Sequence, residues 1–308
     1  MTFVLLSFVV DGEARAGIAV DGSVIDLARE TGNARFADLG AVLADWGNAE
    51  VMLTVLTARA RRGALSAPSE PLGEVRLGAP LVPGNIYCAG ANYTDHVEEM
   101  AHALNVPVGL NAKGKGEDPW HFVKTSRNAV VGPDDVIELP SFSEKVDHEI
   151  ELVAIIGRRA KDVPVAQALD YVAGYTIGND LSVRDVGRSD VPTGSPFHFD
   201  WITMKCFDGS CPLGPWIVPA SQVADPQNLA LKLWVNGELR QDSNTNRMIF
   251  TVAEQIAWLS TRVTLHPGDA ILTGTPAGVG LPHGRFLRRG DTVRMWIEGI
   301  GEMRNALI

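Results

Sequence analysis

The segment from residue 146 to 156, VDHEIELVAII, places three carboxylates in a run of strand-forming apolar residues. Asp147, Glu149 and Glu151 occupy every second position, so one strand would point all three to the same face. A solvated edge face would tolerate such an acidic row. The continuation LVAII is apolar on both faces, however, which is typical of a covered strand. Carboxylates that face a covered site need a cation, a basic partner or a proton.

Short strand-like segments dominate the chain beyond residue 75. Stretches such as NIYCAG, YTIGND, WITMKC, LALKLWV and AILTG are separated by turn residues. Few strand-helix-strand units are visible, which favours a mixed α/β, predominantly β roll or barrel over a doubly wound sheet. Hairpin turns are expected at Asp11-Gly12, Asp21-Gly22 and Asn236-Gly237, because these dipeptides accept the positive φ of two-residue turns.

The first 75 residues differ from the rest in the order of their elements. Residues 1–27 alternate as strand, turn and strand, and two helix-like stretches follow near 35–45 and 50–61. The polar segment SAPSEPLGE, which contains two prolines, then precedes a new series of strands. We therefore expect a small N-terminal α+β domain over 1–75 and a larger, β-rich domain over 76–308.

Three helices are expected within the larger domain. The first follows Asp95, whose spacing to Glu98 fits a capping box. The second is expected over 164–174, between a proline and a glycine. The third begins at Thr251, with Glu254 completing another capping box.

Composition and charge exclude several classes of partner. The chain has 27 Lys and Arg against 37 Asp and Glu, a formal net charge of -10, and no basic run, so nucleic acid is not an expected partner. The opening FVLLSFVV is too short to span a membrane and is expected to be a first strand. Cys88, Cys206 and Cys211 form no CxxC pair and indicate neither a disulfide framework nor a thiolate zinc site. A cytoplasmic protein without a membrane partner is expected.

A third acidic residue extends the group in the 146–156 segment. Asp180, in YTIGNDLSVRD, lies at the expected end of a strand, next to a turn. Together with Glu149 and Glu151 it would form an all-carboxylate set, which suits Mg²⁺, Mn²⁺ or Ca²⁺ and not zinc.

A histidine and a glutamate share one face of the first of these helices. His96 and Glu99, in GANYTDHVEEM, are three residues apart. A lone histidine there is more often structural than catalytic. A nearby carboxylate can fix the imidazole tautomer and raise its basicity, as a general base requires, so we predict a catalytic pair.

These segments, in this order, resemble the fumarylacetoacetate hydrolase family. The resemblance extends from about residue 85 to 280 and implies that family's β-roll or barrel catalytic domain, with a homodimer as its assembly. The segments that carry it are GANYTDHVEE, FVKTS, VDHEIELVAIIG, GNDLSVRD, ITMKCFDGSCPLGPWIVP, VNGELRQ and ILTGTPAGVG.

The resemblance implies a divalent-metal enzyme. Glu149, Glu151 and Asp180 would hold Mg²⁺ or Mn²⁺, with Ca²⁺ as a non-physiological occupant. His96 with Glu99 would activate water. For Asp147 the resemblance implies no role, because the family pattern requires only the two glutamates.

The resemblance also implies a set of residues that contact the substrate. Lys205 matches an active-site lysine that would stabilise an oxyanion or enolate. Thr275, in GTPAG, matches a threonine that contacts the substrate carboxylate. Tyr93, Lys124 and Gln241 are further candidates for the same pocket.

The segment 101–120, AHALNVPVGLNAKGKGEDPW, is longer than the short connection expected in the smaller acylpyruvate-cleaving relatives. Its polar, glycine-bearing composition is compatible with a substrate lid and equally with an inert surface loop. It bears on which substrate is bound and not on the metal site.

The expected activity is metal-dependent hydrolysis of a carbon-carbon bond in an acylpyruvate or 2,4-diketo acid, a small 2-oxo acid substrate. The His96 and Glu99 pair favours hydrolysis, which needs activated water. The alternatives on the same metal site are decarboxylation of oxaloacetate and isomerisation of a hydroxymuconate-type acid. A protein that binds a cation or sugar acid without turnover is a further alternative.

Overall fold

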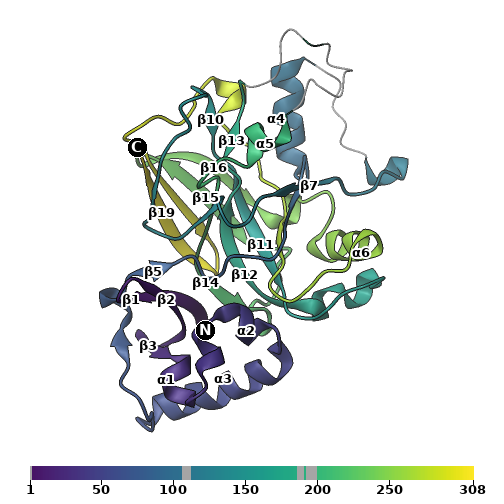
Figure 1. Ribbon diagram of the computed structural model, residues 1–308. Coiled ribbons are helices and arrows are strands. Elements are labelled where there is room, and N and C mark those ends of the chain that lie inside the picture. The colour runs from purple at the N-terminus through teal and green to yellow at the C-terminus, as the bar shows by residue number, and fades with distance from the viewer. Residues whose placement is uncertain (1, 106–111, 186–190, 192–199) are drawn as a thin grey trace.

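The computed structural model describes residues 2–105, 112–185, 191 and 200–308 (Figure 1). Its strands are β1 Val4–Val10, β2 Glu13–Val20, β3 Ser23–Asp26, β4 Glu70–Pro71, β5 Leu77–Gly78, β6 Ile86–Ala89, β7 His121–Lys124, β8 Val130–Val131, β9 Val136–Ile137, β10 Val146–Asp147, β11 Ile150–Ile156, β12 Val172–Asn179, β13 Ser182–Val183, β14 Cys211–Pro219, β15 Ala230–Val235, β16 Glu238–Asn244, β17 Ala270–Leu272, β18 Thr292–Ile297 and β19 Gly301–Leu307.

Helices are fewer than strands in these ranges. The α-helices are α1 Leu27–Thr31, α2 Leu39–Leu43, α3 Trp46–Arg61, α4 Thr94–Leu104, α5 Trp201–Lys205 and α6 Val252–Arg262. The 3₁₀ helices are η1 Ala34–Ala37, η2 Leu72–Glu74, η3 Lys113–Lys115, η4 Val165–Tyr171, η5 Ala220–Gln222, η6 Thr245–Arg247 and η7 Leu281–His283. The expectation of a mixed α/β, predominantly β fold is confirmed. In the described ranges, no helix combines the length and the apolar character that crossing a membrane requires.

The described strands form three sheets. A 12-stranded sheet has the path β4-β3-β2-β1-β14-β12-β11-β17-β6-β7, with β5 paired to β1 and β8 paired to β14. A 5-stranded sheet has the order β16-β15-β18-β19-β9, and β10 pairs with β13. Buried side chains of β11 and β12, such as Leu152 and Ile177, join Leu233 and Met295 of the smaller sheet in one core.

The N-terminal strands β1 to β3 form the expected meander, with α1 to α3 beside them at the bottom of Figure 1. All three predicted hairpins are confirmed, and Asp11 and Gly12 have φ of 53° and 85° at the first of them. The large sheet continues past residue 75, because β1 pairs with β14 with Leu5 opposite Ile217. The division into 1–75 and 76–308 stays a prediction.

The acidic segment is not one continuous strand, contrary to the sequence expectation. Asp147 ends β10, His148 and Glu149 are irregular, and β11 begins at Ile150. The break occurs because β10 pairs with β13, whereas β11 is held in the large sheet between β12 and β17. Every residue of β11 is buried, as its apolar composition predicts.

Of the three helices expected in the larger domain, two are present and one is not. The segment expected to be a helix over 164–174 forms only η4, and the buried strand β12 begins at Val172. Helix α4 is present, but its N-cap residue is Tyr93, so Asp95 lies inside the helix and forms no capping box with Glu98; its carboxylate accepts a hydrogen bond from the Ser243 hydroxyl at 2.6 Å. The capping box of Thr251 and Glu254 is present at the start of α6.

The segment WITMKC was expected to be a strand and contains a short helix. Asp200 stabilises its start, since the carboxylate accepts a hydrogen bond from the Thr203 N–H at 3.1 Å. Helix α5 therefore presents Lys205 from its last turn and not from a strand end.

Candidate active site

Three buried carboxylates converge where β11 begins and β12 ends. One ligand oxygen from each of Glu149, Glu151 and Asp180 lies within 4.8 Å of the others. Glu149 immediately precedes β11, Glu151 is its second residue, and Asp180 follows β12. The antiparallel pairing of these two strands, with Ile150 opposite Asn179, brings the residues together. We call this group the acidic cradle.

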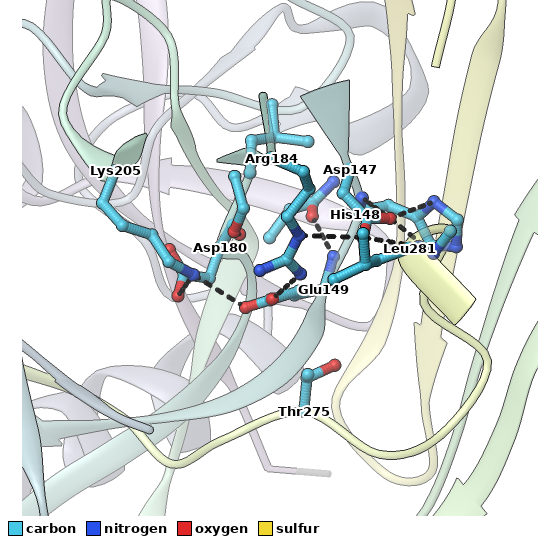
Figure 2. Close-up of polar contacts among 12 residues, drawn as sticks. Asp147, His148, Glu149, Asp180, Arg184, Lys205, Thr275 and Leu281 are labelled. Carbon is cyan, nitrogen blue, oxygen red and sulfur yellow. Dashed lines mark hydrogen bonds and ion pairs between the residues drawn. The ribbon is translucent and has the colours of Figure 1, made fainter. Parts of the chain in front are cut away.

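Two lysines neutralise part of the acidic cradle. The Lys205 ammonium donates to Glu149 Oε2 at 3.0 Å and to Asp180 Oδ2 at 2.7 Å (Figure 2). Lys124, on β7, donates to Asp180 Oδ1 at 2.7 Å and to the Leu181 carbonyl at 3.1 Å. Burial alone would lower the pKa of Lys205, but the neighbouring carboxylates raise it above its ordinary value.

Arg184 is a third cation at the site, and the sequence reasoning did not single it out. Its guanidinium bonds to Glu149 Oε1 and, at 3.0 Å, to Asp147 Oδ2. Figure 2 shows Arg184 and Lys205 approaching the Glu149 carboxylate from different sides. Arg184 lies in the quoted segment GNDLSVRD, directly after β13, so its position within that segment was the available signal.

The protonation of the acidic cradle follows from these contacts. Burial raises the pKa of Glu151 well above its ordinary value, and repulsion from Asp180 and Glu149 adds to this. Burial acts in the same direction on Glu149, but the charges of Lys205 and Arg184 overcome it and lower its pKa to about 2. The pKa values of the two glutamates are therefore shifted in opposite directions, although both carboxyl groups are buried.

The acidic cradle fits a hard divalent cation. Glu151 Oε2 accepts the Gly274 N–H at 2.6 Å, whereas its buried Oε1 has no hydrogen-bond partner among the described residues. A buried carboxylate oxygen without a partner is costly, and a cation would satisfy it. The all-oxygen donor set suits Mg²⁺, Mn²⁺ or Ca²⁺.

Asp147 has a different environment and is not one of the clustered ligands. Its Oδ1 accepts the N–H groups of His148 at 2.9 Å and Gly280 at 2.6 Å. Its Oδ2 accepts the Leu281 N–H at 3.1 Å and the Arg184 Nε–H. These four hydrogen bonds satisfy both oxygens of Asp147. We call Asp147, together with Arg184 and the 280–281 backbone, the carboxylate junction.

His96 faces the acidic cradle, while the Glu99 carboxylate contacts other groups. His96 is largely buried, and no described residue forms a hydrogen bond with its Nδ1. Burial lowers the pKa of His96, although Glu149 partly opposes this. Glu99 accepts the Gly278 N–H at 2.9 Å and lies 3.0 Å from His283 Nε2. The predicted catalytic pairing of His96 with Glu99 stays a prediction.

The four substrate-contact candidates lie at three places. The Thr275 hydroxyl donates to the Ile150 carbonyl at 3.0 Å and accepts the Gln241 amide at 2.9 Å, so these two lie together behind the start of β11. Tyr93 is fully buried, and its hydroxyl has no hydrogen-bond partner in the described ranges. Lys124 contacts Asp180 of the acidic cradle.

A cavity of about 160 Å³ opens onto this cluster. Its lining includes His96, Glu149, Glu151, Arg184, Lys205 and Thr275 from the site described above. Trp120, Phe122, Trp201 and Met204 form an apolar side of the same cavity. Sequence reasoning did not identify these apolar residues, because their segments are far apart in the chain.

The predicted lid lies partly outside the described residues. Residues 101–105 complete and cap α4, and η3 with Gly116 follows at 113–116. Residues 106–111, between them, are not among the described residues. The lid stays a prediction.

Comparison with known proteins identifies the family. Residues 85–308 match the family model described as fumarylacetoacetate (FAA) hydrolase C-terminal. The chain belongs to the fumarylacetoacetate hydrolase family. The segments that suggested this resemblance supply the three carboxylates of the acidic cradle, so the match covers the site as well as the fold.

Relatives within the family have different activities. A mitochondrial oxaloacetate tautomerase of Bos taurus is 43% identical over 80% of this chain and 73% of its own. A maleylpyruvate hydrolase from Sphingobium sp. SYK-6, solved with manganese(II) and pyruvate, is 31% identical with a TM-score of 0.75, covering 99% of this chain and 98% of its own. A 2-hydroxyhepta-2,4-diene-1,7-dioate isomerase from Mycobacterium marinum is 32% identical with a TM-score of 0.72 and the same coverage.

Proposed function

We propose that the protein is a divalent-metal-dependent hydrolase that cleaves the carbon-carbon bond of an acylpyruvate or 2,4-diketo acid. The single observation that carries the proposal is the acidic cradle, in which Glu151 Oε1 has no partner, beside a cavity that also contains His96 and Lys205. The solved maleylpyruvate hydrolase, which contains manganese and pyruvate, supports the choice of metal and product.

Glu149, Glu151 and Asp180 would hold the cation. A bound divalent cation supplies Lewis-acid polarisation of the carboxylate and keto oxygens of a 2-oxo acid. The groups of the chain itself perform the remaining work of binding, orientation and proton transfer.

His96 is the proposed general base. Because burial lowers its pKa, the imidazole is neutral near pH 7 and able to accept a proton from water. The water oxygen bonds to the distal carbonyl carbon, and the bond from that carbon to the methylene carbon breaks. The released electron pair forms the enolate of pyruvate, which takes up a proton, and the acyl group leaves as a carboxylic acid.

Lys205 is the proposed stabiliser of the developing negative charge. The neighbouring carboxylates keep its ammonium protonated, so it donates hydrogen bonds and does not act as a base. Thr275, with its hydroxyl oriented by Gln241, is the proposed contact for the substrate carboxylate. Tyr93 and Lys124 are proposed to complete the pocket, and a homodimer is the proposed assembly.

A product-resolved assay tests the hydrolase directly. Purified protein with Mg²⁺ or Mn²⁺ is incubated with acetylpyruvate, and the products are identified by mass. We expect pyruvate and acetate, with no turnover in excess EDTA and a return of turnover when the metal is restored. If acetylpyruvate and larger acylpyruvates stay intact while another 2-oxo acid is converted, hydrolysis is not the function.

Tautomerisation of oxaloacetate is a second candidate, favoured by the 43% identity to the bovine tautomerase. That reaction also forms an enolate but needs only one group that removes and returns a proton, a role that His96 can fill. The same incubation with enol-oxaloacetate distinguishes the outcomes. Loss of enol absorbance at unchanged mass supports the tautomerase, whereas pyruvate and carbon dioxide indicate decarboxylation.

Two further experimental outcomes would support the isomerase or the protein that binds without turnover. A hydroxymuconate-type acid that changes its absorbance at constant mass would indicate the isomerase. Calorimetric binding of Mg²⁺ and oxalate without conversion of any substrate in the panel would indicate a binding protein.

A further inference from the structure

The apolar side of the cavity is made of three aromatic rings that contact one another. The ring centroids of Trp120 and Phe122 are 5.7 Å apart, those of Trp120 and Trp201 are 5.4 Å apart, and those of Phe122 and Trp201 are 5.5 Å apart. We call these three residues the aromatic wall. They come from the strand β7 region and from α5, segments about 80 residues apart in the chain.

The aromatic wall adjoins the charged side of the cavity. Lys205 Nζ, which contacts Glu149 and Asp180, also lies 4.9 Å from the centroid of the Phe122 ring. A ligand bound at the acidic cradle through one end would therefore meet aromatic surface with its other end. The two sides of one cavity thus differ in the chemistry that they recognise.

Two rings of the aromatic wall are only partly buried, which leaves them able to contact a ligand. Trp120 is 50% exposed and Trp201 is 38% exposed, although both line the cavity. Indole rings bury a large area when they pack in a core, so two half-exposed indoles beside one cavity leave surface for a ligand to cover.

The backbone at Gly90 is shaped to accept Trp120. A Cβ on Gly90 would lie 1.8 Å from the Trp120 ring, so no other residue fits there without moving the indole. The Gly90 N–H also donates to the Trp120 carbonyl at 3.0 Å. The ring is therefore held against the peptide at one defined position.

We propose that the aromatic wall binds the distal acyl group of the substrate and selects a flat, conjugated, apolar group such as an aroyl group. This proposal rests on the proposed function, because it names the acyl group of the same 2-oxo acid. Aromatic faces favour offset or edge contact with another π system beyond the gain from buried area alone. A puckered saturated ring of similar size buries comparable area without that gain.

A matched pair of substrates tests the selection. Benzoylpyruvate and cyclohexanecarbonylpyruvate carry six-membered rings that differ mainly in flatness and conjugation. We expect the wild-type protein with Mg²⁺ to favour the benzoyl compound in kcat/KM by roughly 2–10-fold, the usual effect of one aromatic contact. Trp120→Leu should bring the ratio close to one, and Trp120→Phe should restore most of it.

The variant Gly90→Ala tests the same wall without removing a ring. Its added methyl group displaces Trp120, so it should lower the benzoyl preference as Trp120→Leu does. Gly73→Ala is the matched control, because a Cβ there meets nothing within 4 Å. It should keep the wild-type ratio.

A binding measurement separates failure of this proposal from failure of the proposed function. Calorimetry with Mg²⁺ and His96→Ala protein measures the affinity for both substrates with little or no turnover. Turnover of both compounds at equal kcat/KM in wild type, unchanged in Trp120→Leu, overturns the aromatic wall and keeps the hydrolase. Tighter binding of the benzoyl compound that Trp120→Leu abolishes, without turnover in wild type, supports the wall and overturns the hydrolase. Equal affinities for both compounds overturn the wall.

Discussion

The acidic cradle and the carboxylate junction are both built around buried carboxylates, and Asp147 of the junction is only two residues from Glu149 of the cradle. Asp147 and Glu151 are both 0% exposed. Asp147 accepts four hydrogen bonds, from three backbone N–H groups and from Arg184. Within the part of the chain that the structure describes, Glu151 accepts one hydrogen bond, and its second oxygen has no partner.

The hydrogen bonding of a buried carboxylate therefore distinguishes a structural role from a ligand-binding role. A carboxylate whose oxygens are fully satisfied holds parts of the chain together, as Asp147 joins β10 to the 280–281 backbone. A buried carboxylate with an orphaned oxygen and a raised pKa lacks a partner that a ligand can provide. The predictions below test this distinction, beginning with the largest effect.

Removal of the Glu151 carboxylate should strongly weaken metal binding. Loss of an outer-sphere partner typically lowers metal affinity 10–100-fold, so Glu151→Ala, which removes a direct ligand, should weaken Mg²⁺ or Mn²⁺ binding by more than ~100-fold and abolish turnover. Calorimetric titration measures the affinity. Unchanged affinity in this variant would remove Glu151 from the ligand set and erase the distinction from Asp147.

His96 should affect the rate and not the metal. His96→Ala is expected to lower kcat by roughly 10²–10⁴-fold, the usual contribution of a positioned general base, while metal affinity stays near wild type. His102→Ala is the control, because His102 is exposed on the same helix. Near wild-type turnover in His96→Ala would assign His96 a structural role.

Local sequence signals predicted much of the fold. Asp-Gly and Asn-Gly marked hairpins because the positive φ is a property of those residues, and Thr251 with Glu254 marked a helix start for the same local reason. The sequence predicted less well whether a segment forms a strand or a helix where pairing with distant strands decides its structure. Residues 172–174 were expected to end a helix but begin β12, because they fill the buried position between β11 and β14.

The alternating acids and the strand-end position of Asp180 suggested the acidic cradle, and the family resemblance limited the ligands in the 146–156 segment to the two glutamates. The alternation in VDHEIELVAII predicted a single acidic face, but β10 and β11 belong to different sheets and Asp147 bonds elsewhere. Arg184 and the aromatic wall were not predicted, since their roles depend on contacts between distant segments. No local pattern indicates that Trp120 and Trp201 meet.

Asp147→Asn should reduce stability more than metal binding. The substitution removes the charge that pairs with largely buried Arg184 and places an amide near backbone N–H groups. Breaking a buried ion pair typically costs about 3–5 kcal/mol, and we expect that loss in the free energy of unfolding from urea denaturation. Metal affinity should fall less than in Glu151→Ala, because Asp147 acts only through Arg184. The reverse order of the two affinities would contradict the assignment of the junction.

His121 provides the smallest test, at a buried polar group outside both acid clusters. Its Nδ1 has no partner, its Nε2 lies 3.4 Å from the Gln255 amide oxygen, and its ring stacks on Trp258 at 5.5 Å. Burial lowers the pKa of His121 from 6.5 to about 4, despite the hydrogen bond to Gln255. Among the described residues, His121 has no carboxylate partner, in contrast to Arg184 of the carboxylate junction. No ligand is expected to bind it, in contrast to the acidic cradle.

The sign of the pH effect follows from this lowered pKa. Between pH 6.5 and about 4 the unfolded chain binds a proton at His121 that the folded chain does not, so the His121 contribution is full above pH 6.5 and is lost as pH falls. The loss should reach roughly 2–3 kcal/mol near pH 4. Urea denaturation at several pH values, in wild type and His121→Gln, measures the difference in slope, with exposed His102→Gln as control. Equal slopes of unfolding free energy against pH in wild type and His121→Gln would show that the folded protein takes up the His121 proton as readily as the unfolded chain. In that case a buried polar atom without a partner would not by itself destabilise the fold, and the argument made for Glu151 would be weakened.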